Sequence, residues 1–137
     1  MKKMFAIAAV ASILVAANTL FAQGKLDQIL IFKITDPNTP SASLVGTGMT
    51  GFKLTVGEEI LVMAKGVDEN DNEVAIWPTW KADKELSVSV VEGKSKVARI
   101  KAVKAGEGAI FFSAIYIDDS GKKYVGEVMG EVKEKTQ

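Results

Sequence analysis

The chain has 137 residues, with 17 basic and 17 acidic side chains, no histidine and no cysteine. The missing residue types exclude disulfide bonds, thiol nucleophiles, histidine general bases and zinc sites built from histidine or cysteine. The balanced charge gives no electrostatic footprint for nucleic acid or for an anionic membrane surface. We therefore expect a protein that is not an enzyme, holds no cofactor or metal and binds no nucleic acid.

The N-terminal segment has the pattern of a secretory signal peptide. Two lysines near the start are followed by an uncharged stretch, Met4 to Ala17, which is too short to span about 30 Å of hydrocarbon comfortably. Cleavage fits after Ala22 or, alternatively, after Ala17, and the competing interpretation is an uncleaved membrane anchor. The sequence predicts a cleaved signal peptide over residues 1–22. It also predicts export to the periplasm, the cell surface or the medium, without membrane insertion of the mature chain.

The rest of the chain alternates apolar and polar residues between short turn segments, a pattern typical of a β-sandwich or a β-barrel. Ile60, Val62 and Ala64 share one predicted face of a strand, for example, and Leu61 and Met63 share the other. Seven to eight strands are expected, at residues 26–35, 52–56, 59–66, 74–80, 86–91, 97–103, 109–117 and 123–132. The fold class is therefore all-β, with two sheets after the signal peptide.

A single domain is expected, because about 115 mature residues suffice for one hydrophobic core but not for two. Residues 23–51 would supply an N-terminal strand and a flexible connection, and residues 52–132 the centre of the sandwich. Residues 133–137 would form a charged tail. Since no disulfide is available, inward-pointing aliphatic side chains and Trp80 must hold the two sheets together.

Three segments agree in order and spacing with one known family. They are Leu54-Thr55-Val56-Gly57-Glu58, then Trp80-Lys81-Ala82-Asp83, then the stretch from Ile100 to Ile110 with Ala102 and Gly106. They resemble the opening L-x-V-G-E, the strand-C tryptophan with its polar turn, and the V-x-A-x-x-x-G-x-x-x-I segment of the bacterial immunoglobulin-like domains of group 2. The resemblance implies an immunoglobulin-like β-sandwich. It also implies a non-enzymatic binding or adhesion module of a bacterial envelope or secreted protein, whose partner is a protein or glycan of the envelope or cell surface.

Aromatic residues suggest an alternative function as a carbohydrate-binding protein. Trp77 and Trp80 differ by three positions, so a regular strand would direct them to opposite faces. We expect Trp80 in the core and Trp77 partly exposed, and the alternative for Trp77 is packing beneath a loop. Trp77, Tyr116 and Tyr124 are therefore the candidate ligand-binding residues.

Outward-facing apolar residues suggest another alternative, a structural subunit of a periplasmic or surface assembly. Leu61, Met63, Phe111 and Ile115 are predicted to point away from the core and are the candidate interface residues. A patch of this kind on a monomer marks an interface, which also allows a homo-oligomer. The competing interpretation is that the N-terminal strand or the connection at residues 36–51 covers these side chains.

One polar segment imitates the start of a calcium-binding loop. Asp68, Asn70 and Asn72 place oxygen atoms at alternate positions, as an EF-hand loop does. Glu73 occupies the position where that loop needs glycine, and no helices are expected on either side. The expected structure is a plain hairpin turn with Asn72 at positive φ, and calcium binding is the alternative.

Overall fold

The computed structural model describes residues 24–136, which form nine strands and one short 3-10 helix, η1 (Ser41–Ser43). The expected all-β fold is thus confirmed, whereas the predicted signal peptide at residues 1–22 lies outside the described residues. No helix among the described residues is long and apolar enough to cross a membrane. The strands are β2 (Gln28–Ile34), β3 (Phe52–Thr55), β4 (Glu59–Val67), β5 (Glu73–Val74), β6 (Thr79–Ala82), β7 (Leu86–Val91), β8 (Lys94–Ala102), β9 (Ile110–Ile117) and β10 (Lys123–Lys133).

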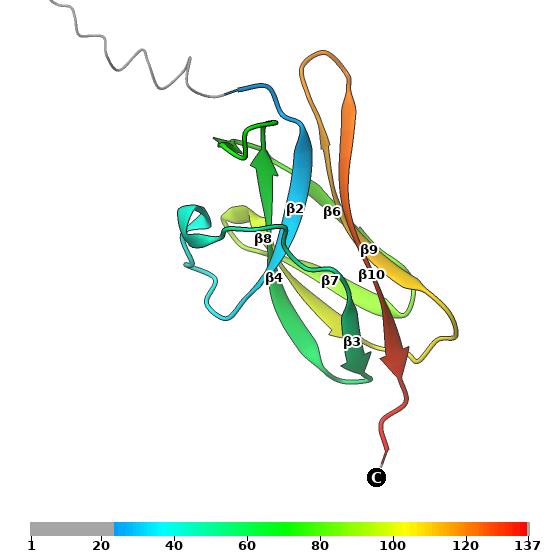
Figure 1. Ribbon diagram of the computed structural model, residues 1–137. Coiled ribbons are helices and arrows are strands. Elements are labelled where there is room, and N and C mark those ends of the chain that lie inside the picture. The colour runs from blue at the N-terminus through cyan, green and yellow to red at the C-terminus, as the bar shows by residue number, and fades with distance from the viewer. Residues whose placement is uncertain (1–23, 137) are drawn as a thin grey trace, which may run out of the picture.

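The strands form two sheets that pack face to face as an immunoglobulin-like sandwich (Figure 1). One sheet has the order β3-β10-β9-β6, and the other has the order β2-β4-β8-β7, with β5 paired to the end of β4. Neighbouring strands are antiparallel, except that β3 runs parallel to the last residues of β10. The short loops between β9 and β10 and between β7 and β8 explain the antiparallel neighbours, because a tight hairpin can only join strands of opposite direction.

The core lies between the sheets and follows the period-two pattern of the sequence. On β10, Tyr124, Val128 and Val132 are buried, while the intervening Val125 and Met129 are exposed. The same alternation buries Ile110, Phe112 and Ala114 on β9 against Val62, Ala64, Ala98 and Ile100 of the opposite sheet. Burial of these apolar side chains is the main source of stability in a chain that has no covalent cross-link.

The strand expected at residues 74–80 is two strands, which is why the count is nine rather than seven to eight. β5 belongs to the sheet of β4, whereas β6 pairs with β9 in the other sheet. The segment between them, with the buried Pro78, carries the chain across the sandwich. Proline has no backbone N–H for a ladder, so it interrupts the pairing at the point where the chain changes sheet.

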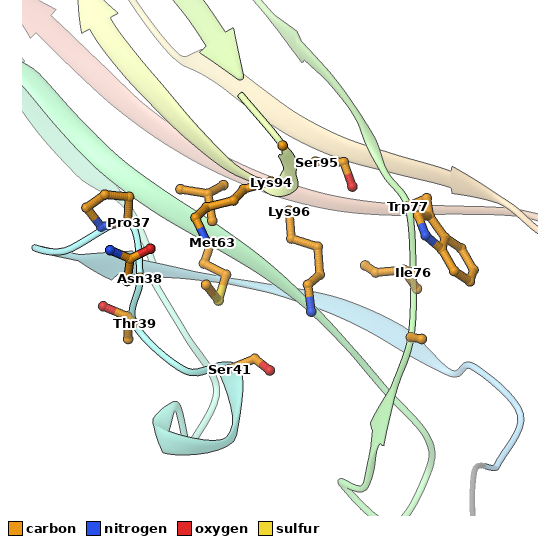
Figure 2. A pocket seen from close by; sticks show the side chains of 13 residues that line it. Pro37, Asn38, Thr39, Ser41, Met63, Ile76, Trp77, Lys94, Ser95 and Lys96 are labelled. Carbon is orange, nitrogen blue, oxygen red and sulfur yellow. The ribbon is translucent and has the colours of Figure 1, made fainter. Parts of the chain in front are cut away.

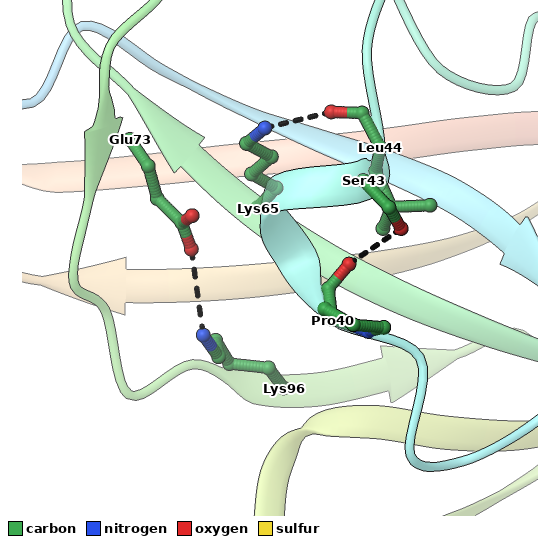
Figure 3. Close-up of polar contacts among 6 residues, drawn as sticks. All are labelled: Pro40, Ser43, Leu44, Lys65, Glu73 and Lys96. Atoms are coloured by element: carbon green, nitrogen blue, oxygen red, sulfur yellow. Dashed lines mark hydrogen bonds and ion pairs between the residues drawn. The ribbon is translucent and has the colours of Figure 1, made fainter.

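The long connection between β2 and β3 also carries the chain from one sheet to the other. Its path is fixed by two hydrogen bonds, from the Met49 N–H to the Ile31 carbonyl at 2.7 Å and from Lys65 Nζ to the Leu44 carbonyl at 2.7 Å. Figure 3 shows the Lys65 side chain reaching from β4 to the segment just after η1. Because Lys65 is buried, this bond satisfies an ammonium group that would otherwise be costly to remove from water.

Two hairpin loops have the same construction although their sequences differ. In the loop after β4, the Asp68 carboxylate accepts hydrogen bonds from the backbone N–H groups of Asn70 and Asn72, at 2.8 and 2.9 Å. In the loop after β9, Asp118 accepts from the N–H groups two and four residues later, both at 2.9 Å. The fourth loop position has positive φ in both, at Asp71 (66°) and Gly121 (89°). The expectation that Asn72 takes positive φ is wrong, because this loop geometry places the left-handed residue one position earlier.

These internal hydrogen bonds make the fold sensitive to acid. The backbone N–H of Asn72 holds the pKa of Asp68 below its usual 3.8, and the hydroxyl of Ser120 does the same for the pKa of Asp118. A carboxyl whose pKa is lower in the folded chain stabilises the fold above the unfolded pKa, and that contribution is lost as the pH falls through the folded value. We expect the melting temperature to fall as the pH is lowered below 3.8.

Asparagine variants test this expectation, because the amide keeps an oxygen acceptor but cannot titrate. In the double variant Asp68→Asn, Asp118→Asn, the melting temperature measured by circular dichroism should depend less steeply on pH in the acid range than that of the original chain. Equal slopes would show that other carboxyl groups dominate the acid response.

Candidate functional site

The three candidate ligand-binding aromatics lie at one end of the sandwich but differ in accessibility. Trp77 is 67% exposed, and its ring lies 6.2 Å from that of the half-buried Tyr116. Tyr124 is buried, and its hydroxyl donates to the Asp118 carboxylate at 3.3 Å. Tyr124 therefore stabilises the β9–β10 hairpin and presents no free ring face to a ligand. Trp77 and Tyr116 remain as the accessible aromatic pair.

Trp80 occupies the interior position expected from the sequence. Its side chain is half-buried and packs against the main hydrophobic cluster. Its indole N–H donates to the Ser95 carbonyl at 2.9 Å, so a residue of the four-stranded sheet is tied to the start of β8 in the other sheet. The division between a packed Trp80 and an exposed Trp77 follows from the break at Pro78, which releases Trp77 from the ladder.

A groove of about 370 Å³ lies beside Trp77, over the outer surface of the five-stranded sheet. Figure 2 shows Asn38, Thr39 and Ser41 on one side of it, and Lys96 and Ile76 on the other. The indole ring of Trp77 points away from Asn38 in this view, so this residue forms the rim rather than the floor. Lys96 is also paired with Glu73 at 3.6 Å (Figure 3). The groove can accept a small ligand that has both polar and apolar parts, because apolar side chains line it together with hydroxyl, amide and ammonium groups.

Sequence reasoning did not identify this groove, because its walls are far apart in the chain. The connection after β2 supplies one wall, and the segment before β6 with the β7–β8 turn supplies the other. None of these segments carries a motif. The only signal in the sequence was the cluster of small polar residues at 36–43, which also fits an ordinary loop.

The four candidate interface residues do not form one surface. Met63 is buried and Leu61 is half-buried, in a second cluster with Ile34, Val97 and Leu44. The N-terminal strand and the connection cover them, which is the competing interpretation stated above. Their outward direction on β4 was predicted correctly, but the prediction that they form a free surface is wrong.

Phe111 and Ile115 do lie on an open surface of the four-stranded sheet. Both are half-buried side chains of β9, and each lies opposite an exposed residue of β10. Ile115 pairs with Val125, which is 48% exposed, and Phe111 pairs with Met129, which is 55% exposed. The two β10 residues were missed as candidates, although their alternation with Val128 and Val132 could have identified them.

Charged residues lie between the two apolar pairs on this surface. Ser113 of β9 is opposite Glu127 of β10 and opposite Lys81 of β6. A shallow hollow of about 350 Å³ lies here, and its lining includes Ser113, Lys81 and Glu127, with Asp83 and Lys123 toward its ends. We call this surface the outer face, and it consists of Lys81, Phe111, Ser113, Ile115, Val125, Glu127 and Met129.

The acidic loop at Asp68 is explained by its own hydrogen bonds. One carboxylate oxygen accepts two backbone N–H groups, and the other accepts the Asn72 side-chain amide at 3.4 Å. No group of three or more acidic, histidine or cysteine side chains that could hold a metal ion occurs within residues 24–136. These hydrogen bonds are those of a hairpin turn, which is the structure expected for this loop.

Comparison with known proteins supports the fold. No protein-family model matches the chain, and no curated protein matches it. Domains 1–6 of the surface layer protein SbsC are similar with a TM-score of 0.54 and 16% identity, over 82% of this chain and 14% of that chain. Domains 4 and 5 of the same S-layer protein are similar with a TM-score of 0.50 and 16% identity, over 80% and 46%. The chain thus spans less than half the length of both structures, and identities this low show the fold alone.

Proposed function

We propose that the chain is a non-enzymatic, extracytoplasmic binding module that joins another protein through the outer face. The observation that carries this proposal is the apolar character of that face. Val125 and Met129 are about half exposed and adjoin Phe111 and Ile115. Lys81 and Glu127 lie between these two apolar pairs, and exposed apolar side chains gathered on one face in this way mark protein interaction sites on monomers.

The location and the family are part of the same proposal. The lysines and the apolar stretch before residue 23 support export, and the three segments quoted above support a place among the group 2 bacterial immunoglobulin-like domains. The likeness to surface-layer domains is a fold-level analogy that agrees with a module of the envelope. More specifically, we propose that the module acts in adhesion or in the assembly of an envelope structure.

Export can be tested by expressing the full chain in a bacterium and measuring the mass of the periplasmic product. Removal of the signal peptide should give a protein that begins at Gln23, or at Asn18 if the alternative site is used. A product that retains residues 1–22 and stays with the membrane would contradict export as a processed chain.

Binding through the outer face can be tested with the exported chain as bait against a detergent-solubilised envelope fraction. The matched variant is Val125→Glu, Met129→Glu, which places two charges on the apolar part of the face while leaving the core intact. We expect the original chain to retain a protein that the variant does not retain. Equal retention by both proteins, with equal circular dichroism spectra, would show that the outer face is not the binding surface.

Carbohydrate binding is a second candidate, favoured by the exposed Trp77, whose ring lies near that of Tyr116, and by the adjacent groove with its mixed polar and apolar lining. An aromatic ring with a free face can stack on a sugar, and the hydroxyl and amide groups nearby can bond its polar groups. If this candidate is correct, Trp77→Ala should abolish binding on a glycan array and leave the melting temperature unchanged. Val45→Ala, at another exposed apolar side chain, should keep binding. Failure of the original chain to bind any glycan would exclude this candidate.

A further inference from the structure

We infer that the partner of the outer face is a second copy of this chain, in a symmetric dimer that pairs Lys81 of each copy with Glu127 of the other. The inference rests on the proposed function, because it names the occupant of the same face. Two observations support the inference. Lys81 and Glu127 lie on either side of Ser113, and apolar residues follow in both directions along the strands.

The two charges lie at one level of the sheet but do not meet within one chain. Lys81 and Glu127 are both opposite Ser113, one on each neighbouring strand. Strands lie about 4.8 Å apart, so the backbones of these two residues are separated by about 10 Å. The ion pairs within residues 24–136 join other side chains. Each charge is therefore available to a partner that presents the opposite charge at the same level.

A second copy presents that charge when the two-fold axis runs along β9. Rotation about this axis exchanges the sides of the sheet, so β10 of one copy lies over β6 of the other. Lys81 then faces the partner's Glu127, and Glu127 faces the partner's Lys81. Ile115 and Phe111 each face their own counterpart, which is the self-complementary contact that a two-fold dimer requires.

The alternative two-fold axis, perpendicular to the strands and centred at Ser113, is disfavoured by the same charges. It keeps each strand over its own copy, so that Lys81 faces Lys81 and Glu127 faces Glu127. Like charges opposed in an interface are strongly unfavourable and exclude that pairing. The charge pattern therefore selects one of the two simple ways of stacking this face on itself.

The shape of the face agrees with the pairing. The hollow of about 350 Å³ lies at the level of Ser113, and two hollows that face each other leave room for the long side chains of the ion pairs. The apolar pairs Ile115–Val125 and Phe111–Met129 lie above and below this level. In the dimer, Ile115 and Phe111 would meet their own counterparts along the axis, while Val125 would lie over the partner's Thr79 and Met129 over the partner's Asp83.

The area of the face predicts a weak dimer. β9 has eight residues, so the face is about 26 Å long, and the three strands β10, β9 and β6 are about 14 Å wide. This footprint is small compared with stable interfaces, which bury about 800 Å² per partner. We expect a dimer that dissociates on dilution, with a dissociation constant in the micromolar to millimolar range.

Charge reversal provides a sharp test of the pairing. In sedimentation velocity experiments on the exported chain, we expect dimerisation to increase with concentration. Lys81→Glu alone and Glu127→Lys alone should each weaken dimerisation by at least about tenfold, since each creates two like-charge contacts. An equimolar mixture of the two variants should dimerise again, because one copy then carries two acidic groups at these positions and its partner carries two basic groups. The control variant Lys101→Glu reverses the charge of an exposed residue on the five-stranded sheet. It should dimerise like the original chain.

Three results would overturn the inference: single variants that dimerise like the original chain, a mixture that remains monomeric, or an original chain that stays monomeric at millimolar concentration. The envelope capture experiment separates this failure from failure of the proposed function. If the original chain is monomeric but loses a captured protein on Val125→Glu, Met129→Glu, the face binds a different partner and only the inference of a second copy is wrong. If neither dimerisation nor capture depends on the face, both proposals are wrong.

Discussion

Replacement of Phe112 by alanine is expected to lower the free energy of unfolding by about 3–5 kcal/mol. Phe112 is fully buried at the centre of the core, and its ring lies 5.4 Å from that of Phe52. The variant loses the transfer free energy of the ring and leaves a cavity that rigid neighbours on both sheets cannot fill. Because a domain of this size has a stability of about 5–15 kcal/mol, the loss would bring the chain close to unfolding.

The adjacent Phe111 provides a matched control for this prediction. It has the same side chain on the same strand but lies on the outer face, where it is half-buried. Phe111→Ala should cost about 1 kcal/mol, a typical value for a partly exposed position. Urea denaturation followed by tryptophan fluorescence measures both variants. Equal losses would mean that β9 does not separate a buried side from an exposed side as described.

Replacement of Gly126 by alanine is expected to cost about 1–3 kcal/mol through overpacking. Gly126 lies on the inner side of β10, against β2. A Cβ at this position would lie 2.7 Å from the Ile29 carbonyl oxygen and 2.9 Å from Ile29 Cγ2. The clash is with backbone and with a β-branched side chain, neither of which can move away easily. The close approach of β2 and β10 therefore requires glycine here.

Lys123→Ala is the control for the glycine variant, because Lys123 lies on the same strand and its side chain is exposed. A surface change of this kind should alter stability by no more than about 0.5 kcal/mol. Urea denaturation curves of both variants give the comparison. A Gly126→Ala protein as stable as the original chain would show that β2 can move away from β10 without loss.

The sheet architecture could be predicted because most strands alternate cleanly and most turns carry glycine or aspartate. Ile60, Val62 and Ala64 face the core as their spacing requires. The sequence did not predict that the chain leaves one sheet after β5 and joins the other sheet at β6. Pro78 indicated an interruption, but a bulge, an edge strand and a crossing all satisfy a residue without an N–H.

The candidate site residues were predicted less well, because exposure depends on segments far away in the sequence. Met63 points away from the core as its spacing indicates, and it is buried only because the connection folds back over β4. That path depends on the bond from Lys65 to the Leu44 carbonyl, across 21 residues of sequence. Tyr124 is buried because the alternation of β10 directs its ring into the main core with Val128 and Val132. The residue pattern 118–121 indicated a turn, but it did not indicate that Asp118 would accept the hydrogen bond of the Tyr124 hydroxyl.

The parallel pairing of β3 with β10 has a consequence for how the domain carries mechanical load. Figure 1 shows the start of β2 and the end of β10 at opposite ends of the sandwich. Tension between these two points would slide β2 along β4, which share seven residue pairs, and β3 along β10, which share four. Ladder bonds lie across the strands, so each row would resist sliding as a group instead of opening one bond at a time. A polypeptide anchored at one terminus and pulled at the other would therefore be loaded in shear.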